Sequence, residues 1–215
     1  MAADALPGTD LRWLTERVGT PFYVYDAAMV QARIDAIVAL TAAPGLQARY
    51  AMKACSAAPI LARMRAHQIW IDAVSGNEVL RAQAAGYPLG AAVPEVMLTT
   101  DVFRDNALDV VRDYGVLPNI GSPHMLDQLA AAGYRGPLGI RLNPGFGHGH
   151  VQSCDTGGPS SKHGIWFDEA LTVAHAATRH GMTVTLLHAH IGSGPAVTEF
   201  TDNIQRLANF FAGCL

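Results

Sequence analysis

Residues 70–87 read WIDAVSGNEVLRAQAAGY, a short apolar run followed by a helical stretch and a closing glycine. The run at 70–74 predicts a β-strand, and the stretch from about Glu78 to Ala85 predicts a helix that ends at Gly86. A strand followed directly by a helix is the βα unit of parallel sheets, in which the helix crosses back over the sheet. The fold class therefore depends on how often this unit recurs.

The strand–helix order recurs six times after residue 45. The predicted strands lie at 46–53, 70–74, 96–100, 117–121, 138–143 and 183–191, and the predicted helices at about 59–66, 78–85, 103–113, 124–132, 167–180 and 199–211. Upstream, a β-type run at Phe22–Tyr25 precedes a predicted helix at 27–40. Several strands are apolar nearly throughout, as expected where both faces of a sheet are covered. This pattern predicts an α/β protein with a parallel sheet.

The composition fits one globular domain with a sizeable core. The chain has 215 residues, of which 50% are hydrophobic and 15% charged, and its formal net charge is −3. These values argue against a disordered chain and against a basic face for nucleic acid. The first 20 residues carry no secretory signal pattern, and no apolar run approaches the roughly 18–20 residues of a membrane span. We therefore expect a soluble cytoplasmic protein with no nucleic-acid or membrane partner.

The three cysteines, Cys55, Cys154 and Cys214, form no CxxC pair. They are too few and too scattered for a disulfide framework or a structural zinc knot. Reduced thiols in a cytosolic protein are the simplest interpretation.

A parallel sheet of this kind can have two architectures, an open doubly wound sheet or a (β/α)8 TIM-type barrel. No G-x-G-x-x-G follows the first strand, so the dinucleotide-binding form of the open sheet lacks its fingerprint. In barrels, functional residues lie at the carboxyl ends of several different strands. Polar residues at those positions here are Lys53, Asp72, Ser75, Thr100, Asp101, Asn119, Ser122, Arg141, Asn143, His188 and His190. The barrel is therefore favoured.

Lys53 and two histidines are the first candidates for chemistry on this rim. Lys53 follows Ala51 in strand alternation, so both are expected to point to one side. A lysine amine can form a Schiff base with an aldehyde, as in pyridoxal phosphate (PLP) enzymes, or can simply extend to the rim. His188 and His190 share a face, where an imidazole could stack on a flat cofactor ring or be a hydrogen-bonded core residue. The IGSG turn at 191–194 offers backbone N–H donors for a phosphate.

Charged residues extend the candidate site. Asp72 and Glu78 lie at a strand-to-helix junction, where Glu78 could also simply favour the helix N-terminus. Arg141 lies on an apolar strand, and a buried guanidinium needs an anionic or acceptor partner. Lysine, arginine, histidine and a Gly-Ser turn on one rim together indicate an anionic, aldehyde-bearing cofactor.

A metal site is the alternative for the same part of the chain. Its conceivable ligands are His148, His150, Cys154, His163, His188 and His190. No H-E-x-x-H or C-x-x-C spacing fixes a coordination geometry, so no metal is expected.

Six stretches carry a resemblance to a known family. They are TPFYVYD (20–26), RYAMKACS (49–56), IDAVSGNEVLRAQAAGY (71–87), IRLNPGFGHGH (140–150), TGGPSSKHGIW (156–166) and HAHIGSG (188–194). In this order they resemble the N-terminal part of the fold-type III PLP-dependent decarboxylases, and among these the diaminopimelate decarboxylases. The resemblance implies a PLP-binding (β/α)8 TIM-type barrel of the alanine racemase/ornithine decarboxylase kind.

The resemblance also implies roles for individual residues. The implied cofactor-binding residues are Lys53, Asp72, Glu78, Arg141, His190 and Ser193. Of these, Lys53 would be the catalytic Schiff-base lysine, and His190 would stack on the pyridine ring as a second catalytic residue. Ser193 would bind the phosphate, and Arg141 would lie near the phenolic oxygen.

The implied activity is PLP-dependent decarboxylation of meso-2,6-diaminopimelate to L-lysine and CO2, the last step of lysine biosynthesis, in a homodimer. Three alternatives stay open. One is a decarboxylase or racemase of another basic amino acid. Another is a non-catalytic PLP-binding protein of cofactor homeostasis. The third is a remnant that does not fold stably.

The resemblance divides the chain into three parts. Residues 1–20 are expected to form an N-terminal extension, and residues 21–26 a strand that pairs with a C-terminal β domain in the family. Residues 27–215 are expected to form a partial barrel of about six βα units. The family's motifs of strands seven and eight and of the β domain have no counterpart in the sequence. We therefore expect a truncated barrel without the β domain, whose activity by itself is in question.

Overall fold

The structure, a computed structural model, describes residues 10–147, 149, 151, 154–194 and 197–214. At its centre is a seven-stranded sheet in which all the pairings are parallel. The strands are β1 (Arg49–Ala51), β2 (Trp70–Ala73), β3 (Val96–Thr100), β4 (Leu117–Ile120), β5 (Pro137–Asn143), β6 (Ile165–Trp166) and β7 (Thr183–Ala189). The predicted α/β class with a parallel sheet is therefore confirmed.

The order of the strands in the sheet follows their order in the chain. β1 to β5 pair consecutively, β6 pairs with the end of β5, and β7 pairs with β5 along most of its length. A doubly wound sheet would reverse its strand order near the middle. Consecutive pairing is the order of a TIM-type barrel, and the sheet here forms part of one.

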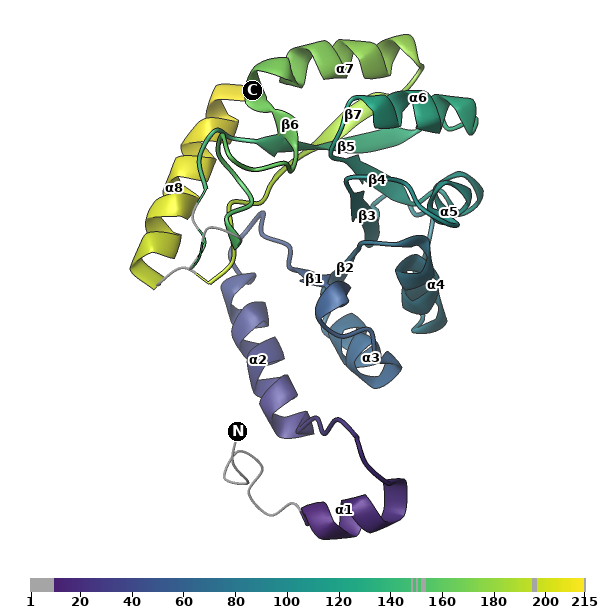
Figure 1. Cartoon of the computed structure of the whole chain (residues 1–215), viewed down its shortest axis with the longest axis vertical. Helices are drawn as coiled ribbons and strands as arrows, with labels where there is room; N and C mark the ends of the chain where they lie inside the picture. Colours follow the sequence, from purple (N-terminus) through teal and green to yellow (C-terminus); the bar gives the residue numbers. More distant parts are fainter. Residues whose placement is uncertain (1–9, 148, 150, 152–153, 195–196, 215) are drawn as a thin grey trace.

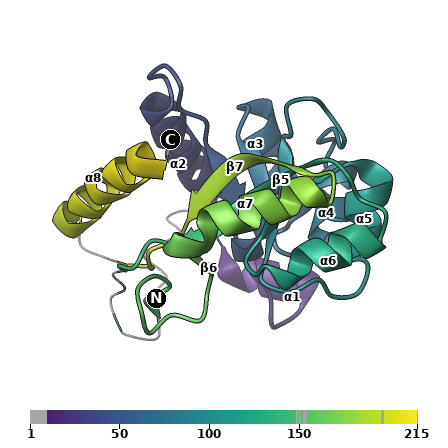
Figure 2. The same cartoon turned by 90° about the horizontal axis from the view of Figure 1, so that it is seen from above.

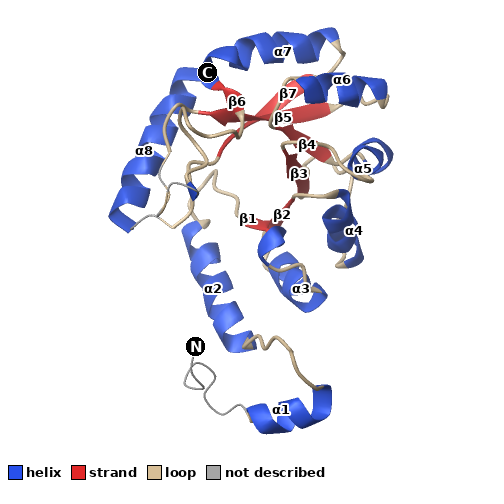
Figure 3. Cartoon of the chain, viewed as in Figure 1, coloured by secondary structure: helices blue, strands red, loops and turns tan. Residues whose placement is uncertain are grey.

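The described residues also form eight α-helices around or beside this sheet. They are α1 (Leu11–Val18), α2 (Ala27–Leu40), α3 (Ala58–Ala66), α4 (Gly76–Ala84), α5 (Ala107–Tyr114), α6 (His124–Ala131), α7 (Ala170–Arg179) and α8 (Val197–Cys214), with 3-10 turns η2 (Met52–Ala54) and η4 (Phe167–Glu169). The strands curve as an arc from β1 to β7, with α3 to α7 outside it (Figures 1 and 3). Seen from above, α7 lies over β5 and β7 (Figure 2).

Alternation along β2 shows how the sheet separates the core from the concave face. Ile71 and Ala73 are fully buried and belong to the main hydrophobic cluster together with Val79 of α4. Asp72 lies between them in the strand, so its side chain points to the opposite, concave face. Apolar residues thus fix the helices outside while polar residues collect inside the arc.

Most predicted elements agree with the structure, but two segments differ. The strand expected to reach Lys53 ends at Ala51, because the chain turns there into η2 and buries Met52. The β-type run at 22–25 forms no strand, because none of the described strands pairs with it; its Tyr23 is 90% exposed. Two further elements, α1 and β6, were not predicted.

Among the described residues, the helices include none with the length and apolar character needed to cross a membrane.

Candidate functional site

A cavity of about 440 Å³ lies at the carboxyl ends of the strands. Five of the residues expected to bind a cofactor line it, namely Lys53, Asp72, Arg141, His190 and Ser193. Residues that were not assigned a cofactor role also line it, among them Thr99, Asp101, Thr156, His163 and His188. Two other cavities, of about 460 and 610 Å³, have mainly apolar walls. The polar cavity is therefore the candidate site.

Lys53 reaches the cavity from η2 rather than from a strand. β1 ends two residues earlier, yet Ala51 and Lys53 both line the cavity. The Lys53 side chain is exposed, and its positive charge acts on both Asp72 and His190. The predicted position at the rim is right, although the local backbone is a turn.

Asp72 supplies a buried carboxylate on the concave face. Burial raises the pKa of Asp72 above its ordinary value, while the Thr99 hydrogen bond, Arg49 and Lys53 oppose that rise. Its Oδ1 atom is buried and has no hydrogen-bond partner among the described residues. An unpaired buried acceptor costs free energy, so this atom favours a ligand or residue that brings a donor.

A chain of hydrogen bonds runs from Asp72 across the floor of the site. Thr99 of β3 bonds to Asp72, and Nδ2 of the fully buried Asn119 donates to Thr99 Oγ1 over 3.0 Å. The same Nδ2 lies 2.9 Å from Nδ1 of His188 on β7. An amide nitrogen can only donate, so Nδ1 of His188 accepts and its ring proton is on Nε2.

Both histidines of the HAH stretch are held neutral by their surroundings. Burial, followed by the positive charge of Arg141, lowers the pKa of His188 to about 4. Burial and the charges of Arg141 and Lys53 also lower the pKa of His190. The hydroxyl of Thr156 bonds to His190 Nδ1 and donates to its carbonyl over 3.2 Å. His190 is therefore an oriented, uncharged ring at the cavity wall.

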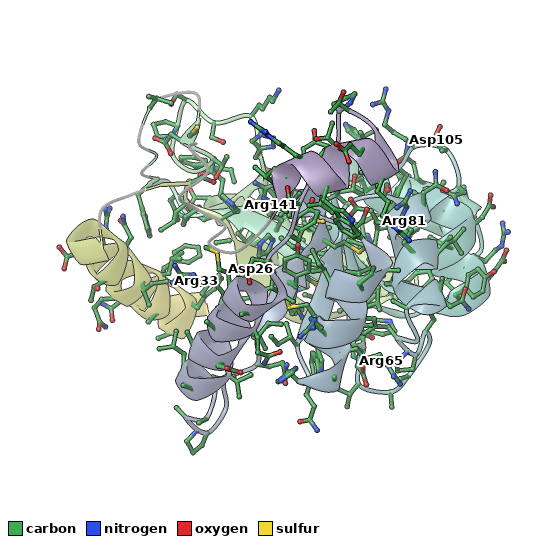
Figure 4. All side chains as sticks on the ribbon, turned by 90° about the horizontal axis from the view of Figure 1, so that it is seen from below. Asp26, Arg33, Arg65, Arg81, Asp105 and Arg141 are labelled. Carbon is green, nitrogen blue, oxygen red and sulfur yellow. The ribbon has the colours of Figure 1, made fainter. Side chains whose placement is uncertain are left out.

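Arg141 is the most enclosed cation of the site, with a side chain only 12% exposed. Its Nη1 lies 3.2 and 3.3 Å from the two carboxylate oxygens of Asp101, at the end of β3. Nδ1 of His163 lies 2.5 Å from Oδ2 of the same Asp101. Figure 4 places Arg141 toward the middle of the molecule, whereas Arg65 and Asp105 lie at its periphery. The anionic partner expected for a buried arginine is thus Asp101.

The turn after β7 offers fewer backbone N–H donors for a phosphate than the sequence predicts. Gly192 and Gly194 have φ values of 143° and 83°, a backbone that glycine alone adopts easily. Ser193 lines the cavity, but its backbone N–H donates to the Cys154 carbonyl over 3.2 Å. The side chain of Ser193 is therefore the part of the turn nearest to a ligand role.

Glu78 is the one expected cofactor-binding residue that does not line the cavity. Its Oε2 accepts the backbone N–H of Val74 over 2.8 Å, and its own N–H donates to Ser75 Oγ over 3.2 Å. These two bonds fix the start of α4 and resemble a capping box, except that Glu78 accepts from Val74 rather than from the cap residue Ser75. The structure thus supports the helix-start interpretation of Glu78, with only a long-range charge effect on Asp72.

The metal alternative concerns partly undescribed residues. His148 and His150 lie outside the described residues. Among the residues that are described, no three His, Cys, Asp or Glu side chains form a group that could hold a metal ion.

Thr99 and Thr156 were not singled out in the sequence. Asp101 and Asn119 were noted at strand ends without a role, and His163 only as a conceivable metal ligand. Strand alternation would place Thr99 on the concave face with Asp101, since the two are two residues apart. No sequence signal would have joined Thr156 to His190, because their contact depends on the path of the loop after β5.

Comparison with known proteins agrees with this geometry. The family profile "Pyridoxal-dependent decarboxylase, pyridoxal binding domain" matches residues 28–214. A diaminopimelate decarboxylase from Streptomyces coelicolor is 43% identical over 190 residues, and one from Escherichia coli 38% over 189. Each alignment covers 88% of this chain but only 42% and 44% of the relative.

Solved structures give the same picture. A crystal structure of diaminopimelate decarboxylase, 34% identical, superimposes with a TM-score of 0.77 and covers 92% of this chain and 47% of that one. The diaminopimelate decarboxylase of Helicobacter pylori complexed with L-lysine has a TM-score of 0.81 at 22% identity, which supports the fold. The chain thus spans less than half the length of the curated relatives and about half that of the solved ones.

Proposed function

The chain belongs to the pyridoxal-dependent decarboxylases through its pyridoxal-binding domain, and from this premise we propose that it forms the PLP-binding part of a diaminopimelate decarboxylase. The single observation that carries the proposal is the cavity that joins Lys53 of η2, Arg141 of β5 and His190, which directly follows β7. The relatives with 43% and 38% identity favour diaminopimelate over other basic amino acids.

The donor set of the cavity fits PLP. An anionic aldehyde needs an amine that can bond to its carbonyl carbon, and it needs cations or N–H and O–H donors for its oxygens. Lys53 provides the amine, Arg141 the cation and Ser193 an O–H donor. The unpartnered Oδ1 of Asp72 is an acceptor suited to a donor brought by the ligand. We propose that Lys53 holds the aldehyde carbon, Ser193 the phosphate, His190 the ring face and Arg141 the phenolic oxygen.

Bound PLP supplies the electron sink for the electron pair left behind when CO2 departs. The chain's own residues set the charge, protonation and orientation of the groups around the cofactor. Neutral His190 presents an uncharged ring, because burial lowers its pKa and Thr156 fixes its orientation. Neutral His188 keeps its proton on Nε2, since Asn119 occupies Nδ1. Arg141 offers the enclosed positive charge, partly balanced by Asp101.

Cofactor binding can be tested by locating the labelled lysine, because the chain has two lysines, Lys53 and Lys162. PLP is added to the purified chain, the absorbance of the adduct is recorded, borohydride fixes it, and peptide mass spectrometry locates it. We expect the label on Lys53, its loss in Lys53→Ala and no change in the control Lys162→Arg. Label on Lys162, or equal label in Lys53→Ala, would overturn the assignment.

A second assay tests the substrate. CO2 release is measured from carboxyl-labelled meso-diaminopimelate, L-ornithine and L-arginine, with L-lysine as the product sought from the first. Release mainly from meso-diaminopimelate supports the proposal, and release mainly from another amino acid assigns that substrate instead. Label on Lys53 without release from any of them would limit this chain to cofactor binding and overturn the proposed activity for the chain by itself.

The remaining expectations rest on the same relatives. We propose that residues 27–215 form the pyridoxal-binding unit, which agrees with the family match at 28–214, and that residues 1–20 are an extension. We also propose a cytoplasmic homodimer with an amino-acid substrate. The exposed Tyr23, Val24 and Tyr25 offer an apolar strip that a second subunit could cover, and sedimentation equilibrium measures the oligomeric state.

A further inference from the structure

Asp101 lies where three strands of the sheet meet the segment that follows β5. Its carboxylate contacts Arg141 of β5 through both oxygens, at 3.2 and 3.3 Å. Its Oδ2 also accepts from Nδ1 of His163 at 2.5 Å. All three side chains line the candidate cavity. One carboxylate therefore joins the enclosed cation of the site to the segment that crosses the rim.

The neighbouring strand leaves room for this carboxylate. Gly121 follows β4 directly, and a Cβ built on it would lie 2.2 Å from Oδ1 of Asp101 and 3.1 Å from its Cγ. Contacts that close are not tolerated, so any side chain at residue 121 would push the carboxylate away. The glycine at residue 121 is therefore what allows the Asp101 carboxylate to lie where it contacts Arg141 and His163.

From these contacts we infer that Asp101 is a positioning residue, which sets the direction of the Arg141 guanidinium and ties His163 to the cavity. The inference rests on the proposed function, since Arg141 is proposed to bind the cofactor. An arginine with a single carboxylate partner keeps free N–H groups for a ligand, because a guanidinium has five donors and the carboxylate engages one nitrogen here.

The alternative is that Asp101 acts only as a counter-charge. The two roles predict opposite signs for Asp101→Asn, which removes one negative charge from a cavity that binds an anion. A counter-charge role predicts several-fold tighter binding of PLP. A positioning role predicts weaker binding, because the amide puts an NH2 group in place of one carboxylate oxygen, and this group cannot accept from Arg141 or His163.

Gly121→Ala separates geometry from charge. It changes no ionisable group, but its methyl group displaces the Asp101 carboxylate. The matched control is Gly213→Ala on α8, where a Cβ meets nothing within 4 Å. PLP affinity is measured by absorbance titration below the unfolding transition of every variant. We expect Asp101→Asn and Gly121→Ala to weaken binding at least tenfold, and Gly213→Ala to change it less than twofold.

A double-mutant cycle distinguishes positioning from a purely structural role. If Asp101 acts through Arg141, then Asp101→Asn has less than a twofold effect in an Arg141→Met background. A structural role would give the same fold-change in both backgrounds. Unchanged or tighter binding in both Asp101→Asn and Gly121→Ala, or additive effects in the cycle, would overturn the inference.

A readout without cofactor keeps the two proposals apart. In ¹⁵N NMR of the histidine side chains, the Nδ1–H of His163 gives a slowly exchanging proton signal that Asp101→Asn abolishes and Gly121→Ala shifts. If this signal behaves as expected but PLP does not label Lys53, the proposed function fails and the positioning contact stands. If PLP labels Lys53 but the signal is absent in the unmodified chain, the inference fails and the proposed function stands.

Discussion

The side-chain amide of Asn119 lies 2.9 Å from Nδ1 of His188, which joins β4 to β7 beneath the cavity. These strands are not neighbours in the sheet, since β5 lies between them. The same amide donates to Thr99, so one fully buried residue connects three strands on the concave face. Asn119 Oδ1 has no hydrogen-bond partner among the described residues, so the stabilising contacts are those of its Nδ2, and removing them leaves two buried partners unpaired.

Asn119→Leu should therefore destabilise the chain. It leaves His188 Nδ1 without its donor and Thr99 without one partner, and each buried group left unpaired costs about 1–3 kcal/mol. We expect the free energy of unfolding in urea to fall by about 2 kcal/mol. The control Gln205→Ala, at an exposed position of α8, should stay within about 0.5 kcal/mol. An unchanged urea midpoint in Asn119→Leu would contradict the role of this contact.

His188 should make the stability depend on pH. Its pKa falls from 6.5 to about 4 on folding, so the unfolded chain binds more protons between these values. The contribution of neutral His188 to the free energy of unfolding is therefore fully present above about pH 6.5. It is lost as the pH falls toward 4, and it amounts to about 3 kcal/mol at most. The measurement is the free energy of unfolding from pH 4 to 7, compared with His188→Gln. The difference between the two curves should change by this amount; parallel curves would show that His188 titrates normally.

Asp72 should behave in the opposite sense. Burial raises the pKa of its carboxyl in the folded state, so the folded chain binds the additional proton and the ionised form lowers stability as pH rises. At pH 7, Asp72→Asn should raise the free energy of unfolding, while it weakens PLP binding. Thermal and urea unfolding measure the first effect, and absorbance titration the second. A large loss of stability would show that Asp72 is structurally favourable as a charge.

Arg49 should be difficult to replace even by lysine. Its guanidinium carbon lies 4.8 Å from the centroid of the Trp70 ring, and its nitrogens donate to the carbonyls of Pro94, Ile71 and Glu95. An ammonium group cannot bridge three carbonyls in this planar arrangement. We expect Arg49→Lys to lower the free energy of unfolding by about 2 kcal/mol. Arg63→Lys, which changes one exposed contact to Gln31, is the control and should have little effect.

Patterns with strong physical causes were predicted well from the sequence. The predicted bounds of β3 (Val96–Thr100) and α2 (Ala27–Leu40) agree with the structure. β3 begins with three buried residues, and α2 has Asp26 as a helix cap that accepts from two backbone N–H groups. The residues at the carboxyl ends of the strands also meet as expected, because parallel strands end at one edge of a sheet.

The errors have physical causes as well. α1 has no buried residue, so it lacks the apolar stripe that marks a packed helix; its signals are Asp10 as cap and Gly19 at its end. β6 has two residues, too few for periodicity. Glu78 does not line the cavity and its carboxylate bonds to the backbone at the start of α4, so its assignment to the cofactor stays a prediction. The contact of Asp101 with His163 spans 62 residues, and no local pattern encodes it.

The order of the strands also bears on how the chain folds during synthesis. From β1 to β5, each strand pairs with the one made just before it, so every new βα unit can dock on a finished edge as it leaves the ribosome. The last step is different, because β7 must pair with β5 after some 40 residues of intervening chain have been made, a delay of seconds at synthesis rates of about 5–20 residues per second. During that interval the edge of β5 is open except where β6 pairs with Leu142 and Asn143, and chaperones or a slow stretch of codons after Asn143 would have their greatest effect there.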